Sequence, residues 1–258
     1  MPAFAANLTM MFNEWSFLDR FDAAAEAGFS AVEYLFPYDF KPEDIQDRLV
    51  RNGLTQALFN MPPGDWAAGE RGLASLSGRF DDVAAGVTRA LAYAEATGVK
   101  NIHLMAGLAD AGDPQARFNY RRAVEHAADR LAERGLNLLL EPINGRNMPG
   151  YFLNDFNAAA QWIGELGLAN VKLQFDIYHC QIIHGDVTTR LRTLMPISGH
   201  VQIASVPSRQ EPDSEELNYP FLFAELDRLG YRGYVGCEYL PRGRTTDGLG
   251  WFEPYKRG

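Results

Sequence analysis

Short apolar runs alternate with amphipathic stretches along the whole chain. The amphipathic stretches place apolar residues three or four positions apart, as at Val83, Val87 and Leu91, which is the spacing of a helix with one buried stripe. Glycine repeatedly precedes the next apolar run, as expected for a helix C-cap that leads into a strand. The runs suited to buried strands lie at residues 4–8, 31–35, 55–60, 101–106, 137–142, 171–176, 200–204 and 234–239.

Eight strand and helix repeats indicate the fold. Strands that alternate with helices form parallel sheets, and eight repeats in 258 residues match a (β/α)8 TIM barrel better than an open sheet. We therefore predict a single barrel domain over residues 1–258. A doubly wound sheet is the alternative, but no G-x-G-x-x-G follows the first predicted strand. The connection at residues 60–78 is longer than an ordinary loop of about 4–6 residues, so we expect it to act as a lid.

Composition and charge narrow the classes of protein. The chain is 47% hydrophobic and 22% charged, as in a globular protein with a large core. It lacks a run of about 18 apolar residues, so no membrane span is expected. A net charge of -9 argues against binding nucleic acid or anionic lipid. The first fifteen residues contain no basic residue and predict no secretory signal, so we expect a cytoplasmic protein with Cys180 and Cys237 reduced.

Polar residues occur at the ends of the predicted strands, where a barrel of this type forms its active site. These residues are Asn7, Glu33, Asn60, His103, Glu141, Asp176, Gln202 and Glu238. The last four come from adjacent strands and should converge. A single carboxylate at a strand end is usually an ion-pair partner or a cap, but three together repel one another unless a cation neutralises them. Oxygen ligands favour Mg²⁺ or Mn²⁺ over Zn²⁺.

Other residues near these strand ends are candidates for substrate binding. His179 follows the sixth predicted strand and could reach a substrate oxygen, whereas His103 is either a core residue or a substrate contact. Arg209 follows the seventh strand and could bind a substrate carboxylate or form a loop salt bridge. Asn7 and Trp66 are further candidates, with Trp66 in the predicted lid.

The chain resembles the hydroxypyruvate isomerases, within the xylose-isomerase-like barrels. The matching segments include AGFSAVEYLFPYD, LEPINGRNMPGYFL, LQFDIYHCQI, HVQIASVPSRQEPD and YVGCEYLPRGRTTDGLGWF. The resemblance implies a (β/α)8 fold and an aldose-ketose type isomerisation of a small oxo acid, with Glu141 and Glu238 as the proton-transferring pair. It also implies a divalent ion, surrounded by Glu141, Asp176, Gln202 and Glu238.

Two substrates fit this resemblance. One is hydroxypyruvate, which is converted to tartronate semialdehyde through an enediolate, and the other is the four-carbon 2-oxo-tetronate. The resemblance leaves a homo-oligomer possible.

Three alternative functions are open. A ketose 3-epimerase is disfavoured, because those enzymes usually carry histidine at the position of Gln202 and a glutamate near Asn147. A noncatalytic sugar-binding barrel would not need two proton-transferring glutamates. An endonuclease for abasic DNA would need several histidine ligands and a basic face, whereas this chain has five histidines in all.

Overall fold

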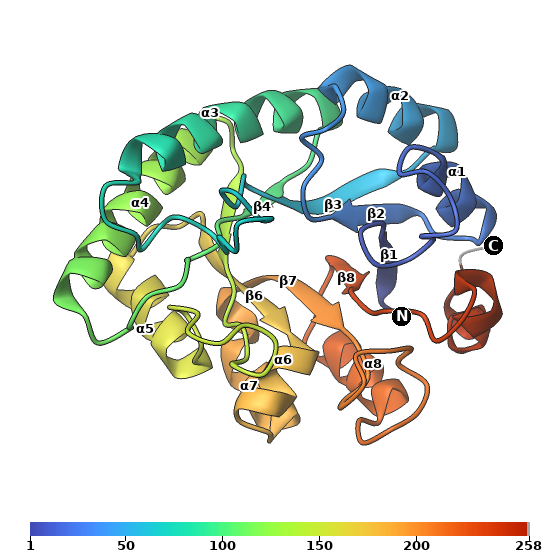
Figure 1. Cartoon of the computed structure of the whole chain (residues 1–258). Coiled ribbons are helices and arrows are strands. Elements are labelled where there is room, and N and C mark those ends of the chain that lie inside the picture. The colour runs from blue at the N-terminus through green and yellow to red at the C-terminus, as the bar shows by residue number, and fades with distance from the viewer. Residues whose placement is uncertain (257–258) are drawn as a thin grey trace.

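Eight parallel strands form a closed barrel in the computed structural model, which describes residues 1–256. The strands follow one another around the barrel in chain order, and the first pairs with the last, so the predicted (β/α)8 fold is confirmed (Figure 1). They are β1 (Ala3–Asn7), β2 (Ala31–Tyr34), β3 (Thr55–Asn60), β4 (Asn101–His103), β5 (Asn137–Leu140), β6 (Val171–Asp176), β7 (Ser198–Ile203) and β8 (Tyr234–Cys237).

Helices surround the barrel (Figure 1). They are α1 (Asp19–Glu26), α2 (Pro42–Asn52), α3 (Phe80–Thr97), α4 (Pro114–Ala132), α5 (Phe156–Leu166), α6 (Ile177–Ile183), α7 (Val187–Leu194) and α8 (Tyr219–Arg228). Two helices, α6 and α7, lie between β6 and β7, and two short 3-10 helices, Thr245–Trp251 and Glu253–Tyr255, follow β8. In residues 1–256, no helix has both the length and the apolar composition needed to cross a membrane.

Local sequence signals fix the helix ends. The glycines expected to end helices adopt positive φ, for example Gly53 at 61° after α2 and Gly98 at 73° after α3, a conformation that costs glycine little. At the other end of a helix, the side chain of Asp155 accepts a hydrogen bond from the backbone N–H of Ala158 and caps α5. Gly53, Gly98 and Asp155 therefore mark helix ends in the predicted alternation of helix and strand.

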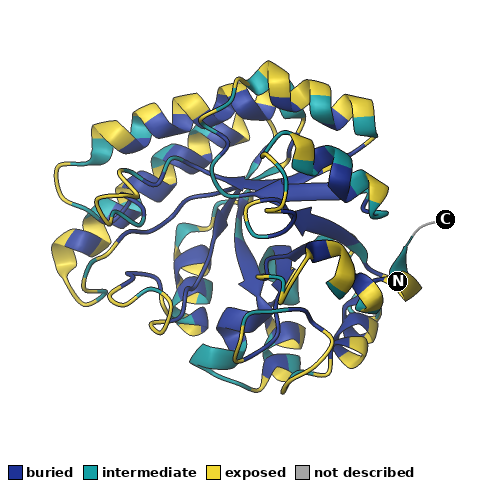
Figure 2. Cartoon of the chain, turned by 45° about the vertical axis from the view of Figure 1, so that its right-hand side comes forward, coloured by how far each residue is buried: buried dark blue, intermediate teal, exposed yellow. Residues whose placement is uncertain are grey.

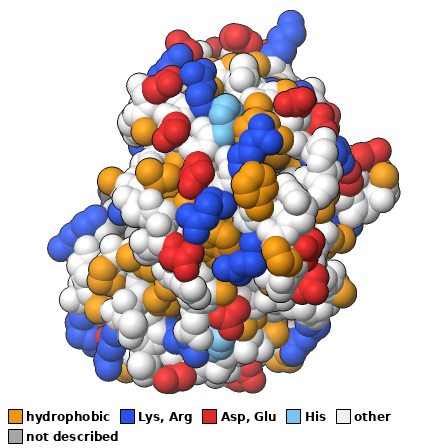
Figure 3. All heavy atoms as spheres, turned by 90° about the vertical axis from the view of Figure 1, so that its left-hand side faces the viewer, with side chains coloured by type: hydrophobic (Ala, Val, Ile, Leu, Met, Phe, Trp, Pro, Cys, Tyr) orange, Lys and Arg blue, Asp and Glu red, His pale blue; other side chains and the backbone are white. Residues whose placement is uncertain are grey.

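The main hydrophobic core lies between the barrel and its helices. Strand residues such as Val32, Leu173 and Val201 belong to this cluster and are buried. Figure 2 shows the strands buried and the helices exposed on their outer sides. On the face in Figure 3, acidic and basic side chains are interspersed.

A polar hydrogen-bonded network fills part of the barrel interior. Glu33 is fully buried and accepts hydrogen bonds from Asn7 Nδ2 at 3.0 Å and Gln202 Nε2 at 2.9 Å. His200 Nε2 lies 2.7 Å from the other carboxylate oxygen of Glu33. Gln174 Nε2 donates to Gln202 Oε1 at 2.6 Å. Because buried polar groups need partners, this network fixes the side chains that adjoin the strand ends.

Several strands end earlier than the apolar runs predicted. The runs at 55–60 and 171–176 match the strands, whereas those at 101–106, 137–142 and 234–239 stop pairing at His103, Leu140 and Cys237. The residues beyond those points stay buried although they leave the sheet, so hydrophobicity alone cannot mark the strand end. Glu141 and Glu238 are consequently the first residues after their strands.

Candidate active site

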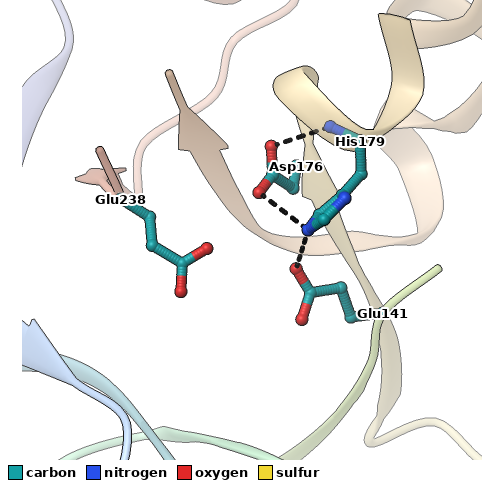
Figure 4. A group of neighbouring side chains, drawn as sticks. All are labelled: Glu141, Asp176, His179 and Glu238. Carbon is teal, nitrogen blue, oxygen red and sulfur yellow. Dashed lines mark hydrogen bonds and ion pairs between the residues drawn. The ribbon is translucent and has the colours of Figure 1, made fainter. Parts of the chain in front are cut away.

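Three carboxylates and one histidine converge at the C-terminal end of the barrel. Glu141, Asp176, His179 and Glu238 each offer a ligand atom, and these atoms all lie within 4.8 Å of one another (Figure 4). Glu141 and Glu238 directly follow β5 and β8. Asp176 ends β6, and His179 lies in the first turn of α6. All four side chains are buried. The structure thus brings together the three carboxylates that were expected to bind a metal.

Two fully buried oxygens of this group have no hydrogen-bond partner in residues 1–256. Asp176 Oδ1 caps α6 by accepting from the backbone N–H groups of Tyr178 at 2.7 Å and His179 at 3.2 Å, but Asp176 Oδ2 is unpartnered. Glu141 Oε1 is also buried and unpartnered. Leaving an anionic oxygen buried without a partner is costly, so this donor set fits a divalent cation.

Burial and mutual repulsion perturb the three carboxylates. Burial raises the pKa of Glu141 well above its usual value, and Glu238 and Asp176 raise it further. Burial also raises the pKa of Asp176, and that of Glu238 to about 8, although Arg209 opposes both shifts. The three carboxyl groups therefore have too little positive charge around them. Binding a proton or a cation would stabilise them.

Arg209 forms an ion pair inside the site. Its Nη2 donates to Glu238 Oε2 at 2.8 Å, and its guanidinium lies 5.0 Å from the centre of the Tyr178 ring. Burial lowers the pKa of Arg209, but the neighbouring carboxylates raise it by more, so it remains charged. Its backbone has φ 59° and is held by hydrogen bonds with Ser205 and Leu240. The salt bridge expected for Arg209 is therefore present inside the site, whereas its expected contact with a substrate carboxylate stays a prediction.

His179 is a neutral ring beside the carboxylates. Its Nε2 lies 3.7 Å from Asp176 Oδ2 and 3.9 Å from Glu141 Oε1 (Figure 4). Burial lowers the pKa of His179 well below its usual value, and Arg209 and His103 lower it further. Asn144 contacts the other ring nitrogen. The histidine is thus held in one orientation against the site.

A cavity of about 270 Å³ opens onto this group. A cavity of this size suits a ligand of a few carbon atoms. Its walls combine apolar side chains with a few polar ones. They are Met10, Leu35, Asn60, Trp66, Arg71, His103, Met105, Glu141, Ile143, Asn147, Met148, His179, Arg209 and Glu238.

His103 and Trp66 line this cavity, as a role in substrate binding requires. His103 Nδ1 lies 3.4 Å from Glu141 Oε2, and neither ring nitrogen has a hydrogen-bond partner in residues 1–256. Burial lowers the pKa of His103 to about 3, so its ring is neutral. Trp66 is 39% exposed at the edge of the cavity, where it packs 5.2 Å from Phe36.

Asn7 and Gln202 belong instead to the polar network inside the barrel. Asn7 donates to Glu33 and accepts from the backbone N–H of Thr9, so both ends of its amide are engaged, and it is not among the lining residues. The amide of Gln202 is held between Glu33 and Gln174. Since a carbonyl oxygen has two lone pairs, Gln202 Oε1 keeps one after accepting from Gln174.

Sequence reasoning missed several polar residues of the site, among them Arg71 and Asn144. Arg71 lies within the predicted lid and lines the cavity, but no periodic signal distinguishes it from other loop arginines. Asn144 follows Glu141 by three residues in the segment EPINGRN, where a short polar residue close behind a strand end is the only available signal.

Residues 21–255 match the family model of the xylose isomerase-like TIM barrels. The chain belongs to this family. It is similar over its full length to the family's hydroxypyruvate isomerase branch, including the 2-oxo-tetronate isomerase of Cupriavidus necator, with 55% identity over 257 residues and 99% of each chain covered. It is 42% identical to the hydroxypyruvate isomerase of Escherichia coli over 258 residues, covering 99% of this chain and 100% of that one.

Several solved structures share the fold of this chain. A structure from Brucella melitensis described as an AP endonuclease, family 2, has 51% identity and a TM-score of 0.97, with 100% of both chains covered. D-allulose and D-psicose 3-epimerases are more distant, at 18–19% identity, and show a common fold alone.

Proposed function

We propose that this family member is an isomerase that interconverts a small 2-oxo acid and its aldehyde or ketone isomer by moving a proton between C3 and C2. The observation that carries the proposal is that Glu141 and Glu238 enter one small cavity from the loops after β5 and β8. The similarity to isomerases at 42–55% identity supports the same reaction class.

The residue types match the chemistry of this reaction. With hydroxypyruvate, a base removes a proton from C3, and the electron pair forms the C2–C3 double bond of an enediolate. A proton is then delivered to C2, while the hydroxyl oxygen on C3 loses its proton and the oxygen on C2 gains one. The product is tartronate semialdehyde. Glu141 and Glu238 supply the base and the acid, because both carboxyl groups line the cavity and a carboxyl group can take up and release a proton.

The charges that develop on substrate oxygens need nearby donors. His179 and His103 are neutral rings at the cavity wall, and each can donate one N–H to a substrate oxygen. The guanidinium of Arg209 places a positive charge beside the carboxylate of Glu238. Since that charge favours the ionised form, Glu238 is the better candidate for the base and Glu141 for the proton donor.

A divalent ion, Mg²⁺ or Mn²⁺, is part of this proposal. The unpartnered oxygens of Glu141 and Asp176 support it, with Glu238 and the free lone pair of Gln202 as the further ligands. When bound, such an ion polarises the substrate carbonyl as a Lewis acid.

The four-carbon acid is the first substrate to test. Identity is 55% to a 2-oxo-tetronate isomerase and 42% to a hydroxypyruvate isomerase. The same transfer between C3 and C2 would turn 2-oxo-tetronate into its 3-oxo isomer, so one site serves both acids.

Proton NMR in D₂O tests the proposal directly. The protein is incubated with each acid, after EDTA treatment and again with Mg²⁺ or Mn²⁺ added, and with Glu141→Gln as the inactive control. We expect product formation with solvent deuterium at the proton-accepting carbon. Absence of both product and exchange with either acid, in the metal-loaded protein, would overturn the proposal.

A duplex with one abasic site serves as the test for nuclease activity. Its phosphates would meet a chain of net charge -9, whose site offers three carboxylates and one histidine. We therefore expect no incision under the conditions that support isomerisation.

A further inference from the structure

Two cations, Arg71 and Arg209, line the cavity among residues 1–256. A 2-oxo acid carries one carboxylate that a ketose of the same length lacks, so one of these arginines is the natural partner of that group. Their surroundings differ enough to decide between them.

Arg209 is already balanced by the site. It donates to Glu238 and lies among the three converging carboxylates. The guanidinium therefore already has an anionic partner in Glu238, with Asp176 and Glu141 close by. A substrate carboxylate placed there would compete with Glu238 for Arg209 and would lie beside other carboxyl groups.

The positive charge of Arg71 is not neutralised by a neighbouring carboxylate in the described part of the chain. Its Nη1 donates to the backbone oxygens of Trp66 at 3.0 Å and Glu70 at 2.7 Å, and its guanidinium lies 3.9 Å from the centre of the Trp66 ring. In the described part of the chain, no carboxylate lies within 4.0 Å of it, and neither Nε nor Nη2 has a protein acceptor. The adjacent Glu70 pairs with Arg79 instead.

The backbone beside Arg71 is fixed to the barrel. Gly72 forms a bridge to Ala106, and the N–H of Ser75 donates to Ala106 oxygen at 2.8 Å. Gly72 has φ 101°, and a Cβ there would lie 2.4 Å from the backbone oxygen of Met105. Only glycine permits this approach, so Arg71 is anchored just beyond β4, the strand that carries His103.

We propose that Arg71 binds the substrate carboxylate through its free Nε and Nη2 groups and so selects oxo acids over neutral ketoses. These two N–H groups form one edge of the guanidinium, which matches the two oxygens of a carboxylate. The stacking on Trp66 and the bonds to the loop hold that edge in place before the substrate arrives. This inference rests on the proposed function for its choice of ligand.

Matched pairs of substrates test it. Dihydroxyacetone is hydroxypyruvate with CH₂OH in place of the carboxylate, and erythrulose relates to 2-oxo-tetronate in the same way. For Arg71→Gln we expect kcat/KM for the oxo acid to fall about 10²-fold, mainly through KM, as for loss of a charged hydrogen-bonded pair. The kcat/KM of the neutral ketose, or its inhibition constant against the oxo acid, should change less than about threefold. Arg71→Lys should recover only part of the loss, because an ammonium cannot bind both oxygens at once.

Arg79→Gln is the matched control, since Arg79 holds Glu70 of the same loop and lies outside the cavity. It should affect acid and ketose equally. If Arg71→Gln also lowers both equally, or lowers neither, the proposal is overturned.

A binding measurement separates this inference from the proposed reaction. Glycerate carries a carboxylate where glycerol carries CH₂OH, and the binding of either compound can be measured without a reaction. Calorimetry should show glycerate binding that weakens about 10²-fold in Arg71→Gln, and this result would stand even if the protein isomerised neither oxo acid. Glycerate binding that is unchanged in the variant would overturn the assignment whatever the activity.

Discussion

The backbone N–H of Asn144 donates to Nδ1 of His179 at 3.2 Å, and the side-chain amide nitrogen of Asn144 lies 2.7 Å from the same atom. The amide cannot be turned round, because its oxygen accepts from the N–H groups of Arg146 and Asn147. Nδ1 of His179 is therefore an acceptor, and the ring proton is on Nε2, which faces the carboxylates of Glu141 and Asp176. In this tautomer, Nε2 of His179 is a hydrogen-bond donor that faces the site.

Asn144→Asp should disturb this tautomer. The new carboxylate would replace the amide donor with an acceptor and would draw the ring proton to Nδ1. We expect a loss of about 10²-fold in kcat, at the low end of the 10²–10⁴-fold range of general acid-base effects. Long-range ¹H–¹⁵N NMR should show Nε2 protonated in the unmodified protein and Nδ1 protonated in the variant. An unprotonated Nε2 in the unmodified protein would contradict the assignment.

Glu141→Gln and Glu238→Gln should each lose at least about 10²-fold in kcat, because glutamine preserves the side-chain volume but cannot carry the proton. The double variant should lose much less than the product of the two single losses, as expected for residues that act in one step. Metal content must be measured in each variant, since both residues are also proposed ligands. Near-normal turnover of either variant with unchanged metal would exclude the proton-transfer pair.

Asp176→Asn separates metal binding from folding. The remaining side-chain oxygen can still cap α6, whereas the unpartnered anionic oxygen, Oδ2, is lost. In EDTA-treated protein, Mn²⁺ at about 100 times its Kd should stabilise the unmodified chain by about 2.7 kcal/mol. Thermal melts should show that most of this gain disappears in Asp176→Asn, while the metal-free variant melts no lower than the metal-free unmodified protein, because a buried, unpartnered charge has been removed. An equal metal-dependent shift in both proteins would remove Asp176 from the ligand set.

Gly236→Ala should destabilise the barrel. A Cβ at Gly236 would lie 2.2 Å from Glu33 Oε2, and hydrogen-bond partners hold that carboxylate so that it cannot move aside cheaply. We expect a loss of about 1–3 kcal/mol in the free energy of unfolding in urea. Gly164→Ala is the control: this exposed position in α5 has no atom within 4 Å of the added Cβ and should gain about 0.5–1 kcal/mol. Equal changes in the free energy of unfolding at both positions would mean that the Glu33 carboxylate moves aside at little cost.

The sequence by itself determined the barrel and the acids at its mouth. Hydrophobic periodicity is a local property, and it located the strands of the barrel within a few residues. Because the C-terminal ends of parallel strands meet at one end of a barrel, the positions of Glu141, Asp176 and Glu238 along the chain were enough to predict that they converge.

Tertiary structure alone decided the partners within that site. The pairing of Arg209 with Glu238, the contact of Asn144 with His179, and the place of Arg71 at the cavity wall all depend on loops, whose paths follow no sequence period. Asn7 shows the same limit, because its strand-end position predicted a substrate contact, whereas its amide is engaged by Glu33 and Thr9. Strand periodicity fixes which residues reach the barrel mouth, but the packing of loops and buried polar groups fixes which atoms they contact.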